Sequence, residues 1–229
     1  MASAIAQIVA HFHDAPPAIR HYSRWKLRLD PVYVAVDHEV PRRAHVLDLG
    51  AGLGLLGQWL TRVAAERVER TVLGVEWDAA KVAHGARAIQ GSASTLVEGD
   101  VTKLDSVLAD DARFDAVTLV DLLHYFDVET QRTILAGAVS RLNDEGTLLI
   151  RDGSGGTLGA RWTEWLERIA VKIGWNRSAR EPRWLSFEAL RAQLEGAGMT
   201  VTVRSLSGPL HPGNALLVAR LRGHGRADS

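Results

Sequence analysis

The chain has 229 residues, and its 27 basic and 27 acidic side chains give a formal net charge of zero. This length supports one sizeable domain with its own hydrophobic core, and the balanced charge argues against a nucleic-acid partner. The sequence contains no cysteine, which excludes disulfides, thiolate zinc sites and a cysteine nucleophile. No stretch reaches the roughly 18 apolar residues of a membrane helix, and the N-terminus lacks the basic leader of a signal peptide. We therefore expect a cytoplasmic protein without membrane contact.

The sequence has two parts that differ in their pattern of polar and apolar residues. Residues 1–44 mix polar and apolar positions, are interrupted by prolines and predict a helical cap. From residue 45 onward, short apolar runs alternate with amphipathic stretches, which is typical of a parallel sheet with crossover helices. In chain order, we predict a strand at 45–50, a helix at 55–68, a strand at 71–77, a helix at 78–89, strands at 94–100 and 114–123, a helix at 128–142, a strand at 145–152, a helix at 186–199, and strands at 200–206 and 215–221.

The last two predicted strands are joined by a short segment at 207–214, which has no room for a crossover helix, so this pair should be antiparallel. Asp78 and Ser186 precede two of the helices and are suitable N-caps. We expect one α/β domain over residues 1–229, with a doubly wound, seven-stranded and mostly parallel sheet whose last strand is antiparallel.

Residues 153–184 do not follow the alternation of strand and helix. The segment begins rich in glycine, and Trp162 and Trp165 then share one face of a predicted helix with three apolar residues. We interpret the segment as an inserted cap helix over the edge of the sheet. Its apolar face suits core packing, and its aromatic side chains would also suit the entrance of a site for a planar acceptor.

An apolar stripe and a basic stripe share the predicted helix at 17–30. The apolar stripe contains Ala18, Tyr22, Trp25 and Leu29, and the basic stripe contains Arg20, Arg24 and Arg28. One interpretation is a helix that packs on the domain through its apolar stripe and leaves the basic side in solvent. The other is a lid whose arginines, or His21, hold an anionic ligand.

The strongest motif is a glycine-rich loop that follows the first buried strand. Gly50, Gly52 and Gly54 alternate with other residues and precede a helix, so the loop permits close approach of a ligand to the backbone. A dinucleotide-binding loop would need glycine at position 55, which is Leu55 here. The loop therefore favours a cofactor with a single nucleoside.

Two acidic residues follow the next two strands. Glu76 ends the second strand and could accept hydrogen bonds from both ribose hydroxyls of a nucleoside, or it could be a solvated acid at a strand end. Asp100 ends the third strand and could accept a hydrogen bond from an adenine amino group, or it could cap a short helix. Their positions at strand ends favour the binding roles.

The segments VLDLGAGLG, GVEWD, EGDVT and FDAVTLVDLLHYF resemble, in order and spacing, the successive signature segments of class I S-adenosylmethionine-dependent methyltransferases. The resemblance covers about residues 44–152. It implies the strand order 3-2-1-4-5-7-6 and S-adenosylmethionine bound at the carboxyl ends of strands one to four. We expect the methionine portion of this cofactor to lie over Gly50 and Gly52. The cofactor-binding residues that it implies are Asp48, Gly50, Ala51, Gly52, Glu76, Trp77, Asp100, Val101, Asp121 and Leu122.

The turn after the fourth strand passes beneath the transferred methyl group in this family. The resemblance therefore places Asp121 near the methionine amino group or the sulfonium, and His124 and Tyr125 toward the methyl acceptor. We predict that His124 is the base, since histidine has an unperturbed pKa near 6.5, although it could instead pack against the cofactor. We expect no metal, because Asp121 and Asp152 lack a third ligand and His11 and His13 resemble solvated residues.

The acceptor should be a small molecule. The sequence DLLH at 121–124 lacks the Asn/Asp-Pro-Pro-aromatic signature of amino-methylating nucleic-acid enzymes, which favours methylation of oxygen or carbon. The residues expected to contact the acceptor are Tyr22, Arg24, Trp25, Arg28, Trp162 and Trp165. Two rival functions are a nicotinamide-dependent oxidoreductase and a non-catalytic binding subunit with the same fold. The sequence leaves a homodimer open.

Overall fold

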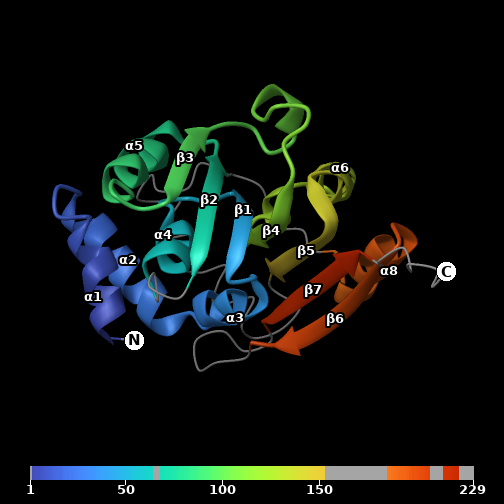
Figure 1. Ribbon diagram of the computed structural model, residues 1–229, viewed down its shortest axis with the longest axis horizontal. Helices are drawn as coiled ribbons and strands as arrows, with labels where there is room; N and C mark the ends of the chain where they lie inside the picture. Colours follow the sequence, from blue (N-terminus) through green and yellow to red (C-terminus); the bar gives the residue numbers. More distant parts are fainter. Residues whose placement is uncertain (1, 64–67, 153–184, 207–213, 222–229) are drawn as a thin grey trace.

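The computed structural model describes residues 2–63, 68–152, 185–206 and 214–221, and a seven-stranded sheet runs through its centre (Figure 1). The strand order is β3-β2-β1-β4-β5-β7-β6, as the sequence resemblance predicts. The strands are β1 (Arg43–Leu49), β2 (Glu69–Glu76), β3 (Ser94–Glu98), β4 (Phe114–Val120), β5 (Leu142–Asp152), β6 (Met199–Ser205) and β7 (Ala215–Leu221). Strands β1 to β5 are parallel, and β7 is antiparallel to both β5 and β6, which confirms the predicted final pair.

Helices cover both faces of the sheet. They are α1 (Ala2–Ala10), α2 (Pro17–Leu29), α3 (Val32–Glu39), α4 (Leu55–Arg62), α5 (Ala79–Ala88), α6 (Val128–Ser140) and α8 (Phe187–Gly196), with short 3₁₀ turns η1 (Leu104–Ser106) and η2 (Leu123–Tyr125). Leu47 and Leu49 of β1 face a core shared with α6 and α8, whereas Val46 faces a second core shared with α1, α3 and α4. Side chains that alternate between two buried faces explain why the parallel strands read as continuous apolar runs.

The sheet reverses its order between β1 and β4. Strand β1 pairs in parallel with β2 on one side and with β4 on the other, so the chain leaves β1 in one direction and later returns to its opposite side. In an open α/β sheet, such a reversal opens a crevice at the carboxyl ends of the two strands. This crevice is where the glycine-rich loop and the turn after β4 meet.

Local helix signals agree with the structure at two of the helix starts. The Asp78 carboxylate accepts hydrogen bonds from the backbone N–H groups of Ala80 and Lys81, and the Ser186 hydroxyl accepts one from Ala189. Both predicted N-caps are confirmed. The predicted helix at 55–68 is too long, because α4 ends at Arg62 and Val63 has extended backbone angles. Valine is β-branched and stabilises a helix poorly.

The prediction that α2 packs on the domain through its apolar stripe is wrong. Trp25 is 62% exposed and Tyr22 is 44% exposed, whereas Ser23 and Leu27 are buried. Helix α2 therefore presents a mainly aromatic face to the outside. The predicted cap helix with Trp162 and Trp165 lies outside the described residues.

Helix α3 joins the N-terminal cap to the far end of the sheet. The buried carboxylate of Glu39 accepts from Arg204 of β6 and from Arg220 of β7, each at 2.7 Å. These ion pairs link the N-terminal cap to the antiparallel end of the sheet. In the part of the chain that the structure describes, no helix has the length and apolar character needed to span a membrane.

Candidate active site

The glycine-rich loop runs from the end of β1 to the start of α4. The N–H groups of Gly50 and Ala51 donate to the carbonyl of Val75 in β2, at 2.9 and 3.1 Å. Gly50 has a φ of +75°, and a Cβ there would lie 2.7 Å from the Leu122 side chain. Glycine is required at this position because the turn after β4 lies directly against the loop.

Gly52 supplies the open part of the loop. It has a φ of +58°, and a Cβ built there would meet no atom within 4 Å. Its N–H donates to Glu76 Oε2 at 2.9 Å, while Glu76 Oε1 accepts from the N–H of Asp78 at 3.0 Å. The Glu76 side chain thus lies between the loop and the start of α5 and is 3% exposed.

Glu76 has the chemistry that a ribose site needs. Each carboxylate oxygen has two lone pairs, so the two backbone hydrogen bonds leave acceptor capacity for two hydroxyl groups. Trp77, the next residue, is half exposed and lies at the same strand end. The open space at Gly52 beside a buried acceptor fits the nucleoside part of S-adenosylmethionine.

Asp48 lies beneath the loop and is buried. Its Oδ1 accepts from the Thr118 hydroxyl of β4 at 2.7 Å. Burial raises the pKa of the Asp48 carboxyl to about 7; the hydrogen bond from Thr118 opposes this shift, and the Glu76 carboxylate adds to it. Asp48 therefore titrates near neutral pH, and its hydrogen bond joins β1 to β4 just before the glycine loop.

Asp100 lies at the end of β3 and is exposed. Its Oδ1 accepts from both the N–H and the hydroxyl of Thr102, at 2.9 and 2.7 Å. Burial opposes the shift, but these hydrogen bonds lower the pKa of Asp100. The side chain therefore caps a turn, and the neighbouring Val101 is buried. Contact of Asp100 and Val101 with adenine stays a prediction.

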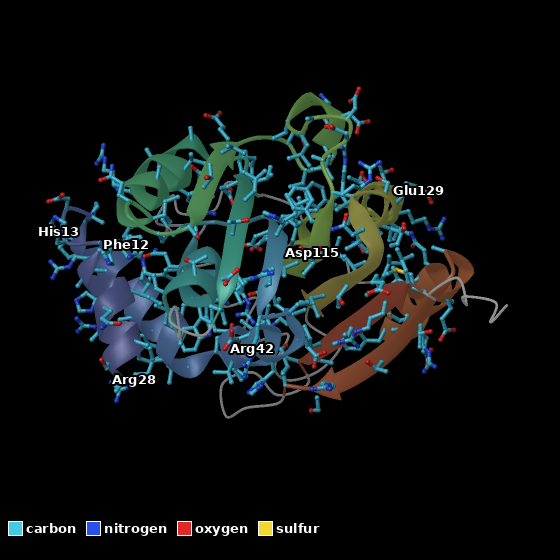
Figure 2. All side chains as sticks on the ribbon, in the orientation of Figure 1. Phe12, His13, Arg28, Arg42, Asp115 and Glu129 are labelled. Atoms are coloured by element: carbon cyan, nitrogen blue, oxygen red, sulfur yellow. The ribbon has the colours of Figure 1, made fainter. Side chains whose placement is uncertain are left out.

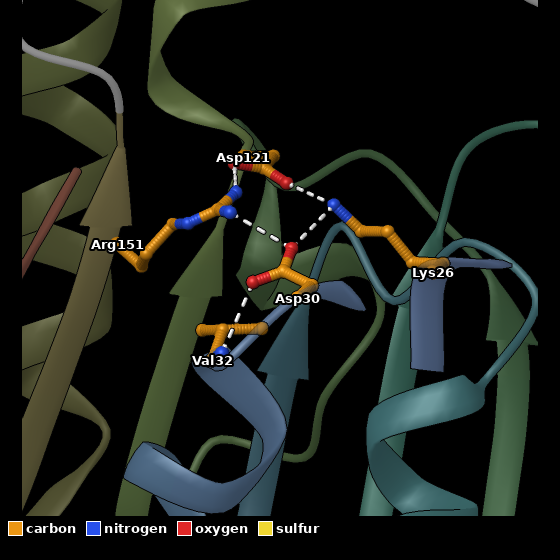
Figure 3. A network of polar contacts seen from close by, with 5 residues as sticks. All are labelled: Lys26, Asp30, Val32, Asp121 and Arg151. Atoms are coloured by element: carbon orange, nitrogen blue, oxygen red, sulfur yellow. Dashed lines mark hydrogen bonds and ion pairs between the residues drawn. The ribbon is translucent and has the colours of Figure 1, made fainter. Parts of the chain in front are cut away.

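Asp121 follows β4 directly. Its φ of +54° is the only positive value among the described residues other than glycine, and its N–H donates to the carbonyl of Arg151 at 2.9 Å. Backbone strain of this kind concentrates at functional sites. The Asp121 carboxylate pairs with Arg151 of β5 and with Lys26 of α2 (Figure 3). Neither cation was predicted as a site residue.

Asp30 completes this group of charges. It accepts from Lys26 at 2.9 Å, from Arg151 at 2.8 Å and from the N–H of Val32 at 3.0 Å (Figure 3). We call Lys26, Asp30, Asp121 and Arg151 the four-charge cluster. Its only local signal is the spacing of Lys26 and Asp30, which is typical of an ion pair within a helix.

His124 and Tyr125 lie in η2, directly after Asp121 and Leu122. The His124 side chain is 3% exposed, and its ring centroid lies 4.1 Å from that of Tyr125 with an angle of 46° between the ring planes. The two rings therefore hold each other at the end of β4. Whether His124 removes a proton from the acceptor stays a prediction.

The two stripes of α2 have different relations to the crevice. Successive residues of a helix lie about 100° apart, so Tyr22 lies about 40° around the helix from Lys26, which pairs with Asp121. Arg24 and Arg28 lie about 160° from Lys26. Figure 2 shows Arg28 at the outer edge of the molecule, beside α2. Tyr22 thus borders the crevice and Trp25 lies further around the helix, about 100° from Lys26, while the two arginines face away.

The structure thus brings together the residues of the glycine loop, Glu76, Asp121, Leu122 and His124. Asp100 lies at the neighbouring strand end, and Trp162 and Trp165 lie outside the described residues. Within those residues, no group of three or more His, Cys, Asp or Glu side chains could hold a metal ion. His11 and His13 are both exposed.

Comparison with known proteins agrees with this geometry. Residues 46–146 match the family described as the methyltransferase domain. No curated protein sequence matches the chain. The fold is similar to an O-methyltransferase family protein from Burkholderia thailandensis, with a TM-score of 0.65 and 20% identity over 88% of this chain. The chain spans 57% of the length of that protein.

Two further proteins of known structure share the fold, with similar TM-scores and sequence identities. Magnesium protoporphyrin IX methyltransferase from Synechocystis PCC 6803 has a TM-score of 0.59 and 18% identity, over 83% of this chain and 80% of that one. It was solved with S-adenosylhomocysteine and with S-adenosylmethionine. A TehB-like methyltransferase from Corynebacterium glutamicum has a TM-score of 0.61 and 16% identity, over 93% of this chain and 98% of that one.

Residues 46–146 match the methyltransferase domain, and the sheet order is the one expected for class I S-adenosylmethionine-dependent methyltransferases. This confirms the resemblance drawn from the sequence. The open space at Gly52 beside Glu76 fits S-adenosylmethionine, the cofactor that the sequence resemblance implies.

Proposed function

We propose that this protein transfers a methyl group from S-adenosylmethionine to an oxygen or carbon atom of a small molecule. The observation that carries the proposal is the buried Glu76, which hydrogen-bonds the N–H of Gly52 at the edge of an open glycine loop. S-adenosylmethionine supplies an electrophilic methyl group on its sulfonium. The protein then has to hold the acceptor in line with that methyl group and remove its proton.

We assign the removal of the acceptor's proton to His124, with Tyr125 beside it. His124 lies three residues beyond Asp121 in the turn after β4, where the family places the acceptor. The ring of Tyr125 packs against it at 4.1 Å, which restricts the orientation of the imidazole. Burial of His124 also keeps bulk water from competing for the proton.

The aromatic stripe of α2 supports an aromatic acceptor rather than an anionic one. Tyr22 and Trp25 are exposed, at about 40° and 100° around α2 from Lys26, and planar rings bind planar ligands well. Arg24 and Arg28 lie on the opposite side. Lys26 is already paired with two carboxylates. The crevice therefore offers apolar contact but no unpaired arginine from this helix.

The acceptor proposal is tested by two variants of the same helix. A screen of planar phenols and of aliphatic carboxylates of similar size, read as release of S-adenosylhomocysteine, identifies an acceptor. We expect Trp25→Ala to raise the KM for a phenol by about two- to tenfold, since an aromatic contact contributes about 0.5–1.5 kcal/mol. Arg24→Ala is the control and should leave KM unchanged. If only carboxylates are methylated and Arg24→Ala raises their KM, the acceptor is anionic rather than aromatic.

Binding of cofactors separates this function from its rivals. S-adenosylhomocysteine should raise the melting temperature and give a calorimetric heat, whereas NADH should give neither. Binding of NADH without binding of S-adenosylhomocysteine would favour an oxidoreductase. A protein that binds S-adenosylmethionine but releases no S-adenosylhomocysteine with any acceptor in the screen would be a non-catalytic binding subunit.

A further inference from the structure

Helix α2 exposes much of the apolar side-chain surface of the molecule. The described part of the chain has five exposed large apolar side chains, and three of them, Tyr22, Trp25 and Leu29, lie on α2. Ala18 of the same apolar stripe is also exposed. Successive residues of a helix lie about 100° apart, so the whole stripe occupies an arc of about 60°. Single exposed apolar residues are normal, whereas a gathered patch of them marks a binding surface.

A basic side of α2 adjoins the apolar stripe. Arg28 lies about 60° around the helix from Trp25, on the side away from Tyr22, and Arg24 and Arg20 follow further around. The three arginines are exposed, and none of them makes an ion pair with a residue that the structure describes. The apolar stripe and the three arginines therefore form one continuous exposed surface, which we call the α2 surface.

The end of the molecule that carries the α2 surface is poor in acidic residues. Among residues 1–29, Asp14 is the only acid, and its carboxylate lies 3.1 Å from the imidazole of His13. Helix α1, which packs beside α2 (Figure 1), has no charged side chain. Lys26 is already neutralised by its carboxylate partners. The exposed arginines therefore make this end positive, although the whole chain has no net charge.

We propose that the α2 surface binds to a lipid bilayer that contains anionic lipids. A helix that lies in the plane of a membrane interface buries its aromatic and leucine side chains at the edge of the acyl chains, while its arginines contact the head groups. Trp25 lies between the rest of the apolar stripe and the arginines, and tryptophan favours this boundary because its ring is amphipathic. A nucleic acid would match the arginines but offers no apolar layer for Leu29.

The expected absence of membrane contact rested on the lack of a membrane-spanning stretch, and a helix on the surface of a bilayer needs none. Helix α2 has 13 residues. It is therefore about 20 Å long, which is too short to cross a hydrocarbon core of about 30 Å but suits a position in the interface. The proposed contact requires neither cofactor nor acceptor, so its test is independent of the proposed function.

Sedimentation of the full chain with lipid vesicles tests the proposal, without cofactor or acceptor. One set of vesicles contains phosphatidylcholine alone, and the other contains equal parts of phosphatidylcholine and anionic phosphatidylglycerol. We expect the parent to sediment with the mixed vesicles at low salt and to bind the neutral vesicles at least about tenfold more weakly. The affinity for the mixed vesicles should fall as salt is added, because salt screens the arginines from the head groups.

Two variants separate the two parts of the α2 surface. Arg24→Gln combined with Arg28→Gln should lower the affinity for the mixed vesicles about 20-fold or more, since each arginine near an anionic surface contributes about fivefold. Trp25→Ser should lower it about tenfold, because a large apolar side chain no longer leaves water. The side chains changed are exposed, so the melting temperature of each variant should equal that of the parent.

Two matched controls change the same kinds of side chain elsewhere. Arg113→Gln removes an exposed arginine just before β4, and Val203→Ser removes an exposed apolar side chain of β6. Both variants should keep the parent's affinity for the mixed vesicles.

Three results would overturn the proposal. If the parent sediments with neither kind of vesicle, the α2 surface does not bind a bilayer. If Trp25→Ser keeps the parent's affinity while the double arginine variant loses it, the arginines attract any polyanion, a nucleic acid included, and the apolar stripe takes no part. If the controls weaken binding as much as the α2 variants do, the contact does not lie on α2.

Discussion

The two halves of the crevice are built in different ways. The half around Glu76 joins residues that lie close in the chain, since Gly52 and Glu76 are 24 positions apart. The half around Asp121 joins distant segments, because Lys26 lies 95 positions from Asp121 and Asp30 lies 121 positions from Arg151. The first half relies on backbone N–H groups and glycine conformation, and the second relies on charged side chains. The residues of the half around Glu76 can be predicted from local sequence motifs. The ion pairs of the half around Asp121 cannot, because their partners lie far apart in the chain.

The largest effect is expected at His124, the proposed base, which follows Asp121 in the turn after β4. His124→Ala should lower turnover about 10²–10⁴-fold while leaving the affinity for S-adenosylhomocysteine nearly unchanged. The parent's rate should fall as the pH falls, because only the neutral imidazole accepts a proton. The measurement is turnover against pH for the parent, for His124→Ala and for His38→Ala, which changes an exposed histidine. A variant that keeps more than about a tenth of the parent's turnover would remove His124 as the base.

The next largest effect concerns the stability of the distant half. Arg151→Met should lower the free energy of unfolding by about 3–5 kcal/mol, because it leaves Asp30 buried with one cation fewer. Urea unfolding measures the change. Arg132→Met is the control, since Arg132 pairs with Glu129 on the surface and should contribute less than about 1 kcal/mol. Equal losses in the two variants would show that the cluster does not stabilise the fold.

In the half of the crevice around Glu76, the residue to test is Glu76 itself. Glu76→Ala should weaken binding of S-adenosylhomocysteine by about 10–100-fold or more, because each charged hydrogen bond to a hydroxyl contributes roughly 1.5–3 kcal/mol. The fold should survive, since the residue ends a strand. Calorimetry on Glu76→Ala and on Glu98→Ala, which changes an exposed acid at the neighbouring strand end, makes the comparison. An unchanged affinity for S-adenosylhomocysteine in Glu76→Ala would show that the ribose does not bind to Glu76.

The smallest expected effect is a dependence of the free energy of unfolding on pH, which is caused by Asp48. Burial raises the pKa of Asp48 in the folded protein to about 7, above its unfolded value of about 3.9. The folded state therefore binds more protons between about pH 4 and pH 7, so the contribution of Asp48 to stability declines as the pH rises through this range. Asp48→Asn should remove the decline and be more stable than the parent at pH 8, by about 1–3 kcal/mol.

Urea unfolding of the parent and of Asp48→Asn at pH 5.5 and pH 8 measures this difference. Comparing the two proteins cancels the titration of groups that they share. Asn keeps an oxygen that can accept from Thr118, so the hydrogen bond beneath the loop is retained. A stability difference that is the same at both pH values would show that Asp48 is already ionised at pH 5.5.

Much of the fold was determined by sequence alone. The sheet order followed from the resemblance of ordered strand-end motifs, and the antiparallel final pair followed from the short segment between the last strands. Asp78 and Ser186 act on N–H groups two or three residues away, so their capping roles need no tertiary information. The helix after the glycine loop was predicted too long, because the ends of helices depend on weak local preferences.

The orientation of α2 was decided only by tertiary structure. Its apolar stripe reads in sequence as a packing face, because helices usually bury such stripes. In the folded chain the ion pairs of Lys26 and Asp30 instead fasten a neighbouring edge of the helix to Asp121 and Arg151, and Trp25 remains exposed. Charges that meet across about a hundred residues leave no spacing pattern in the sequence. Their pairing depends on where β4 and β5 end in space, and the packed sheet alone fixes that position.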